Sequence, residues 1–451
     1  MKSRRGIIVP GIIVLVLIPL PQAFSWSNHT EIAAISLSGE AWSSRQVKAE
    51  SLDDFLATSK DSLPAVLEEV EEKAGKDFPG FRPRPPALAF NPAAAGNALR
   101  DSFLAAIRVN PGMPYSLFLK VPSGGDRKGR PDLPWQKALL SERVLPNAPF
   151  AALAPGETVT ALEVVQTACD EPDYGMDYYL YEDNGSDWGA AYGFGAQPFG
   201  NPKLSYGTQS PFHLSFDNEP ALIHALAKFT TRSNLGYRID LFAALARFAF
   251  ASGHEYWGWR FAGWALHYVQ DITMPYHASL MPTKTTLQLL LLNTFGSKAD
   301  RDGAITLLSN RHAMFENYQY FILTFREGDT AANFALAALL PAPGTPAVAV
   351  RTIDISAKTW AIKSLGAASR ARSFKVDKVV AKVFPAKLIN DPAYDFGAWM
   401  EEIDYTWNPR ADLEARDPAS AAAFDLVLAE SLKAAGDAGR TFTGALAAGL
   451  R

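Results

Sequence analysis

The chain has 451 residues, of which 48% are hydrophobic and 12% aromatic, so it is long enough to bury at least one large core. Its formal net charge is −4 and it has no long Lys/Arg run, which is a weak argument against a protein that grips nucleic acid through phosphates. The single cysteine, Cys169, excludes an internal disulfide, so stability must come from size or bound metal.

The first 25 residues predict a secretory signal peptide. A basic stretch containing Arg4 and Arg5 precedes an apolar run to about Leu20, and small residues precede a cleavage point after Ser25. An uncleaved membrane anchor is the alternative, although the run is short and broken by proline, and a twin-arginine export signal matches loosely. The signal peptide would direct export to the periplasm or the medium, and its cleavage would leave Trp26 as the first residue.

A chain that begins at Trp26 has a possible metal chelate at its end. The free α-amino group has a pKa of about 8, low enough to lose its proton to a metal, and the Trp26 carbonyl oxygen lies beside it. His29 is close enough in sequence to complete the clamp.

Apolar residues recur at helical spacing through most of the chain, which predicts an all-α, multi-helix bundle with helical and Pro-rich insertions. Alternating strand patterns are scarce, and 350–451 shows no sign of a β-sandwich. The clearest predicted helices are Ser51 to Lys76, Ala98 to Val109, Tyr237 to Phe250, Trp257 to Val269 and Ala421 to Ala435.

The segment from Tyr174 to Gly200 is rich in Tyr, Gly and Asp and predicts a long ordered loop. Its aromatic residues, Trp188 and Phe194 among them, would either pack as in an ordinary Ω-loop or line a pocket.

The strongest chemical signal is the pair His267 and Asp271, which one helical turn places on the same face. A proline then ends the helix and lets His277 turn back toward the same pocket. His312 and Glu316 repeat the one-turn spacing. Three of only seven histidines thus lie beside carboxylates, which predicts a zinc site inside the bundle.

Four consecutive leucines lie between these two segments, within Thr286 to Phe295. We expect an ordinary buried helix here; the alternative is a lip that touches a membrane.

The pattern resembles the superfamily that joins bacterial zinc-dependent phospholipases C with the fungal and plant single-strand-specific zinc nucleases. The resemblance covers Trp26 to His29 and roughly Asp170 to Glu316. It implies a trinuclear zinc site, with one ion held by the backbone of the N-terminal Trp. One zinc-dependent phosphodiesterase domain would span 26–451, with a metal-ligand core at 26–39 and 165–330, an insertion at 40–164 and C-terminal helices at 331–451.

The family places an Asp and then a His before the H-x-x-x-D helix. The segment ending in Asp170 resembles the family's Ala-x-Asp, with Asp173 and Asp177 as competitors. The His matches His213, which stands between aromatic residues, whereas His224 lies on an ordinary amphipathic pattern.

The resemblance implies three ligand sets: Asp170, His213, His267 and Asp271 for one zinc; Trp26, His29 and a bridging Asp271 for its neighbour; and His277, His312 and Glu316 for the third. His254 has no carboxylate one turn away and is expected to be structural. The short gap from Trp26 to His29 and the long intervals on both sides of Asp170 depart from the family.

The implied reaction is phosphodiester hydrolysis, with Asp170 orienting the attacking water or accepting its proton. Phospholipase C action on glycerophospholipids, at a membrane surface or micelle, is favoured by Glu316, by the His-x-x-x-Glu-Asn segment beginning at His312 and by the cysteine usage. The alternatives are a single-strand-specific nuclease of the 3'-nucleotidase type, acting on single-stranded nucleic acid, and a non-catalytic protein stapled by zinc. No stable protein partner is inferred.

Overall fold

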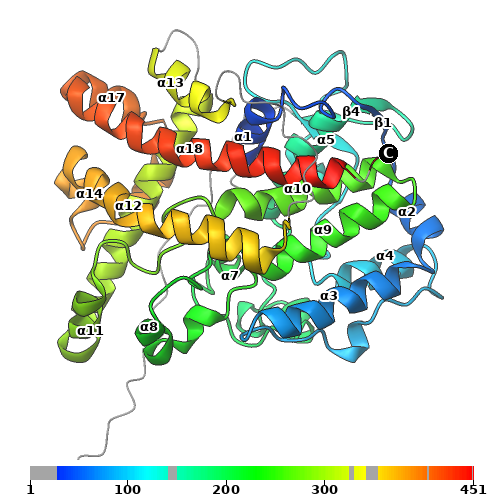
Figure 1. The fold of residues 1–451 in the computed structure, drawn as a ribbon, viewed down its shortest axis with the longest axis horizontal. Helices are drawn as coiled ribbons and strands as arrows, with labels where there is room; N and C mark the ends of the chain where they lie inside the picture. Colours follow the sequence, from blue (N-terminus) through cyan, green and yellow to red (C-terminus); the bar gives the residue numbers. More distant parts are fainter. Residues whose placement is uncertain are drawn as a thin grey trace, which may run out of the picture.

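A computed structural model describes residues 28–140, 150–324, 330–341, 354–403, 406–448 and 450. It is 61% helix and 3% strand, which confirms the all-α fold class. Long helices cross the middle of the molecule, α18 among them, and shorter ones surround them (Figure 1). The signal peptide expected at 1–25 and the expected ligand Trp26 lie outside the described residues.

The helices, in chain order, are α1 (His29–Ser36), α2 (Leu52–Ser59), α3 (Leu63–Asp77), α4 (Asn97–Ala106), α5 (Ala161–Ala168), α6 (Asp187–Ala191), α7 (Ser210–His213), α8 (Ala221–Leu226), α9 (Leu235–Ala251), α10 (Glu255–Asp271), α11 (Thr286–Phe295), α12 (Lys298–Thr324), α13 (Thr330–Leu339), η7 (Ala357–Gly366, a π-helix), α14 (Ala367–Val383), α15 (Ala386–Ile389), α16 (Phe396–Glu402), α17 (Pro409–Arg416) and α18 (Pro418–Ala447).

The helices predicted around residues 240 and 263 are present as α9 and α10. The helix predicted from Ser51 to Lys76 is instead two, because the chain turns between α2 and α3 and a proline occupies the first turn of α3. The C-terminal prediction was too short, since α18 runs through 30 residues. Between 354 and 450, the described residues form helices and connecting segments. This agrees with the absence of an alternating strand pattern in that part of the sequence.

Two short antiparallel strand pairs tie the long segment between α1 and α5 together. Strand β1 (Gln46–Lys48) pairs with β4 (Thr158–Thr160), and β2 (Phe118–Lys120) pairs with β3 (Phe150–Ala152). Three-residue strands are too short to show an alternating pattern, so the sequence did not reveal them. Strand β4 leads directly into α5, whose capping box of Thr160 and Glu163 starts the helix.

Helix α10 is the centre of the core. Every residue from Tyr256 to Asp271 is buried, including three fully buried tryptophans. A helix that is buried on all faces must be covered by other elements, and α9, α5 and α18 pack against it. Polar side chains on a fully buried helix need hydrogen-bonding or charged partners, and those of the last turn are described below.

The leucine-rich helix α11 contradicts the expectation of burial. None of its residues is buried, and Leu287 and Phe295 are 65% and 79% exposed. Helical periodicity predicted this helix, but it could not predict whether other parts of the protein cover it. Among the described helices, none has both the length and the hydropathy that crossing a bilayer requires.

Helices α10 and α5 approach closely at Gly263. A Cβ built on this glycine would lie 2.6 Å from the Ala168 Cβ and 2.7 Å from the Val165 carbonyl oxygen. Backbone on both sides cannot move independently in a close-packed interior, so only glycine fits. This contact holds α10 against the residues that follow α5.

We predict that Gly263→Ala destabilises the protein by about 1–3 kcal/mol because it overpacks this helix contact. The matched control is Gly444→Ala in α18, where a Cβ meets nothing within 4 Å. There alanine should be neutral or stabilising by up to about 1 kcal/mol, since it has the higher helix propensity. Thermal or denaturant unfolding of both variants measures this; equal midpoints would contradict the packing argument.

Candidate metal centre

The last turn of α10 places His267 and Asp271 on one face, both without solvent exposure. The chain then turns tightly, as the backbone N–H of Met274 bonds to the Asp271 carbonyl at 2.9 Å and that of His277 to the Met274 carbonyl at 3.0 Å. The His277 Nδ1 lies 3.0 Å from an Asp271 carboxylate oxygen. The chain therefore turns back after the proline, as predicted, and brings His277 to Asp271.

Two histidines from other helices converge on the same carboxylate. His213, at the end of α7, places Nδ1 3.0 Å from Asp271 Oδ2, and His29, at the start of α1, places Nε2 3.6 Å from Oδ1. His267 Nε2 lies 3.2 Å from Oδ2. Asp271 thus stands among four imidazoles contributed by distant parts of the chain.

The acidic residue beside these histidines is Asp173. Its carboxylate oxygens lie 3.6 Å from His29 Nε2, 3.5 Å from His213 Nδ1 and 3.8 Å from His267 Nε2. Its side chain is 13% exposed, whereas those of the three histidines are at most 2% exposed. Asp173 therefore stands where the cluster meets solvent.

Asp170, the expected ligand, is engaged elsewhere. Its carboxylate accepts from the Lys120 ammonium and from the hydroxyl and backbone N–H of Thr30, at 2.6 and 3.2 Å. Burial alone would raise the pKa of Asp170, but Lys120 and the nearby His29 hold it below its usual value. The structure thus uses Asp170 to fasten α1 next to His29, and sets Asp173 among the imidazoles.

Asp177, the other competitor, also has a cationic partner. The Arg238 guanidinium donates to its Oδ1 at 2.7 Å and the Tyr268 hydroxyl to its Oδ2 at 2.6 Å. The His213 Nε2 lies 3.3 Å from Oδ2, so this carboxylate orients the histidine from behind.

The third set forms between the turn after α10 and the middle of α12. His312 Nε2 lies 2.8 Å from Glu316 Oε1, and His277 Nε2 lies 3.4 Å from the same oxygen. Burial raises the pKa of Glu316 well above its usual value, and burial and the neighbouring His277 lower that of His312. The one-turn spacing seen in the sequence is realised.

Burial and mutual contact strongly shift the pKa values around Asp271. Burial lowers the pKa of His29 to about 3, with help from His267. Burial would lower the pKa of His213, but hydrogen bonds to carboxylates raise it to about 9. Burial would likewise lower the pKa of His277, but Asp271 raises it to about 10. Burial would raise the pKa of Asp271, but the imidazoles of His267, His277 and His213 hold it well below its usual value.

The donor sets suit a metal. Among the described residues, three groups have ligand atoms within 4.8 Å of one another: His29, His267 and Asp271; Asp173, His213 and His267; and His277, His312 and Glu316. Each mixes imidazole nitrogen with carboxylate oxygen, which are zinc donors. The buried Glu316 Oε2 has no hydrogen-bond partner among the described residues, as expected of an atom that faces a cation.

Backbone and amide groups orient two of these rings. His267 Nδ1 lies 2.7 Å from the Cys169 carbonyl oxygen, and His29 Nδ1 lies 2.7 Å from the Gln270 side-chain oxygen. A carbonyl partner at Nδ1 makes that atom the donor and leaves the Nε2 lone pair for a metal.

The remaining histidines lie outside these sets. His254 bonds to Glu50 at 2.8 Å and to Thr58 at 3.1 Å, and His224 bonds to Thr230 at 2.8 Å. In the aromatic loop after Tyr174, Trp188 and Phe194 pack against the main hydrophobic core. These two side chains therefore do not line the site.

Comparisons of the chain with protein-family models, curated proteins and solved structures return no match.

We predict that Asp173→Asn lowers bound zinc by about one ion per chain, because a neutral amide is a poor zinc donor. The matched control is Asp170→Asn, which should keep the full metal content while weakening the fastening of α1. Elemental analysis of the purified, folded variants measures both. Metal loss in Asp170→Asn alone would return the ligand role to Asp170.

Proposed function

We propose that the protein is an exported zinc-dependent phosphodiester hydrolase, and that it acts as a phospholipase C on glycerophospholipids. The observation that carries this proposal is the adjacency of three His/carboxylate sets, two of which share His267, with His213 and His277 each 3.0 Å from the Asp271 carboxylate. The third set has the members that the resemblance to zinc phospholipases C and nucleases implies, whereas the other two contain Asp173 in place of Asp170 and share His267 rather than Asp271. Trp26 remains the proposed N-terminal ligand.

In this proposal the chain's own residues hold and orient the reacting groups. When bound, three zinc ions would supply Lewis acidity at neutral pH and positive charge for a phosphodiester. Asp173, at the solvent-facing edge of the cluster, takes the role first assigned to Asp170: it orients the attacking water and accepts its proton. His277, His312 and Glu316 form the third set, which His277 joins to Asp271 at 3.0 Å, and they would serve the leaving oxygen.

Two features support hydrolysis over a purely structural use of metal. A structural zinc is normally closed by four protein ligands, whereas the set around Glu316 has three within the part of the chain that the structure describes. The Asp173 edge is also accessible to solvent, while a metal that only staples a fold has no need of access.

The choice of lipid over nucleic acid rests on the third set and on charge. Glu316 stands where the nucleases of the resembled superfamily typically have Asp, and Asn317 follows it, as in the phospholipases. The Asn317 side chain is buried and donates to the Ala313 carbonyl at 2.8 Å, so it holds α12 at this point. The net charge of −4 fits a protein that does not bind polyanions over a long surface.

Zinc-loaded protein that begins at Trp26 should release the phosphorylated headgroup from short-chain phosphatidylcholine and leave single-stranded DNA intact. Headgroup release and DNA cleavage are measured side by side. Cleavage of DNA without lipid turnover would move the protein to the nuclease alternative. Turnover of neither would overturn the hydrolase proposal and favour a zinc-stapled structural protein.

His277→Ala should lower kcat/KM by at least about a hundredfold, because it removes a ligand of the third set and a neighbour of Asp271. His254→Gln is the matched control: this histidine bonds to Glu50 and Thr58 outside the sets, so turnover should persist. Equal activity in the two variants would show that the third set has no part in the reaction.

A further inference from the structure

The ring of His312 is held differently from those of His267 and His29. Each of those two rings has an oxygen partner at Nδ1, at 2.7 Å. Among the described residues, His312 has a single hydrogen-bond partner, Glu316 of its own ligand set. A partner outside the ligand set usually fixes the plane of a ligand histidine, so a contact of another kind has to fix the ring of His312.

Tyr276 makes this contact. Its ring lies nearly parallel to that of His312, with an interplanar angle of 13° and ring centroids 5.3 Å apart, as in an offset stack. Both residues are buried, and a close-packed interior passes a displacement of one ring on to the other. Tyr276 also directly precedes His277, so it belongs to the turn that carries the second histidine of the set.

Asp377, on α14, holds Tyr276 in place. Its Oδ1 accepts a hydrogen bond from the Tyr276 hydroxyl at 3.0 Å, and its Oδ2 accepts one from the Arg311 guanidinium at 2.7 Å. Arg311 directly precedes His312 on α12. The buried carboxylate of Asp377 therefore joins the residue before His277 to the residue before His312.

The Arg311 guanidinium is itself anchored by three acceptors. Besides Asp377, it donates to the Asn390 side-chain oxygen at 2.6 Å and to the Ile389 carbonyl oxygen at 3.3 Å. Because a guanidinium is planar and its donors point in fixed directions, several acceptors define its position. Asp377 is thus bonded to a cation that is held in place.

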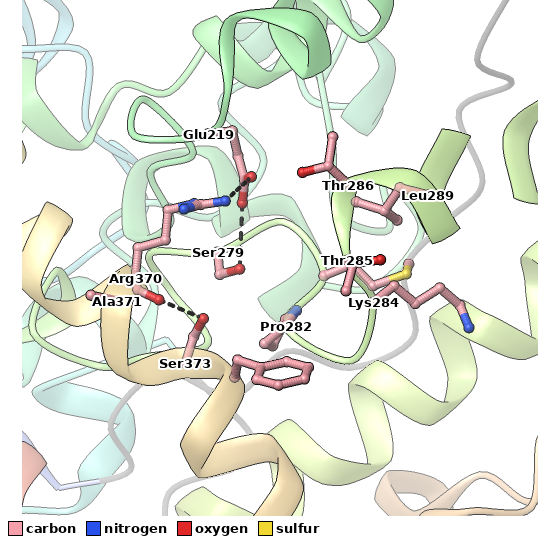
Figure 2. A pocket seen from close by; sticks show the side chains of 12 residues that line it. Glu219, Ser279, Pro282, Lys284, Thr285, Thr286, Leu289, Arg370, Ala371 and Ser373 are labelled. Carbon is pink, nitrogen blue, oxygen red and sulfur yellow. Dashed lines mark hydrogen bonds and ion pairs between the residues drawn. The ribbon is translucent and has the colours of Figure 1, made fainter. Parts of the chain in front are cut away.

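Helix α14 also holds the chain on the other side of His277. Its Arg370 donates to Glu219 Oε2 at 2.8 Å, and Glu219 Oε1 accepts from the backbone N–H of Leu280, three residues after His277, at 2.9 Å. Figure 2 shows Arg370 and Glu219 beside Ser279, where they line a cavity of about 350 Å³. The turn that carries His277 is therefore tied to α14 both before and after that histidine.

We propose that Asp377 is a positioning residue of the third ligand set. Through Tyr276 it fixes the plane of the His312 ring. Through Arg311 it holds α12 against the turn after α10, so the set is arranged before zinc binds. Asp377 lies in the C-terminal helices expected at 331–451, outside the predicted metal-ligand core. The inference rests on the proposed function in one respect, that the third set holds zinc.

The test measures the zinc affinities of folded protein beginning at Trp26, by competition with a chromophoric chelator. Asp377→Asn keeps the size of the side chain and removes its charge, and it should weaken the binding of one ion by about ten- to a hundredfold. Tyr276→Phe keeps the stacked ring and removes only the hydroxyl, so it should weaken the same ion by about fivefold. Unchanged affinities in the folded variants would overturn the proposal.

A double-mutant cycle identifies the ion that is affected. His312→Ala removes a ligand of the third set, so adding Asp377→Asn to it should leave the affinities of the remaining ions unchanged. If the double variant binds a remaining ion more weakly than His312→Ala does, Asp377 acts on another set and the proposal is wrong.

The matched control is Asp425→Asn. Asp425 is buried on α18, accepts from the hydroxyl of Tyr318 on α12 at 2.6 Å and lies 3.6 Å from the Arg410 guanidinium. It thus makes the same kinds of contact, but Tyr318 follows Glu316 by two residues and lies on the opposite side of α12. The control should lose folding stability and keep all zinc affinities. An equal loss of zinc affinity in both variants would show that destabilisation alone loosens the site, and would overturn the positioning role.

Headgroup release from short-chain phosphatidylcholine, measured on the same preparations, separates this inference from the proposed function. Weaker zinc binding by Asp377→Asn in a protein without turnover would refute the hydrolase and leave the positioning role standing. Turnover with unchanged zinc affinities would refute the positioning role alone. An unmodified protein that binds no zinc would overturn both.

Discussion

The structure depends on the burial of one carboxylate, that of Asp271, in the last turn of the central helix. A buried charge costs several kcal/mol unless it is compensated, and here four imidazoles surround it. They come from α1, α7, α10 and the turn after α10. The packing of these segments brings their histidines to Asp271, so the same contacts build the core and the candidate metal centre.

A second layer of ion pairs decides which acidic side chains remain for a metal. Between α5 and α7, three carboxylates are matched to cations from other elements: Asp170 with Lys120, Glu171 with Arg260, and Asp177 with Arg238. Asp173 lies instead among histidines. The insertion therefore contributes to the site. Its strand β2 carries Lys120, which forms an ion pair with Asp170 and so keeps that carboxylate from a metal.

Local spacing predicted the candidate ligand pairs that lie on helices, but it could not predict which other side chains tertiary contacts bring to them. His267 with Asp271, and His312 with Glu316, follow from one-turn periodicity alone. The choice between Asp170 and Asp173 depends on a lysine 50 residues away in a three-residue strand, which leaves no local signal. The exposure of α11 was missed for a related reason, since a run of leucines predicts an apolar face and does not say whether protein covers it.

We propose that these three sets hold zinc in one connected centre. Anomalous diffraction at the zinc edge, from crystals of the zinc-loaded protein beginning at Trp26, would locate the ions. We expect three peaks, two at the Asp271 carboxylate and one between His277, His312 and Glu316. Zinc-loaded crystals in which these side chains are ordered but no anomalous peak lies among them would contradict it.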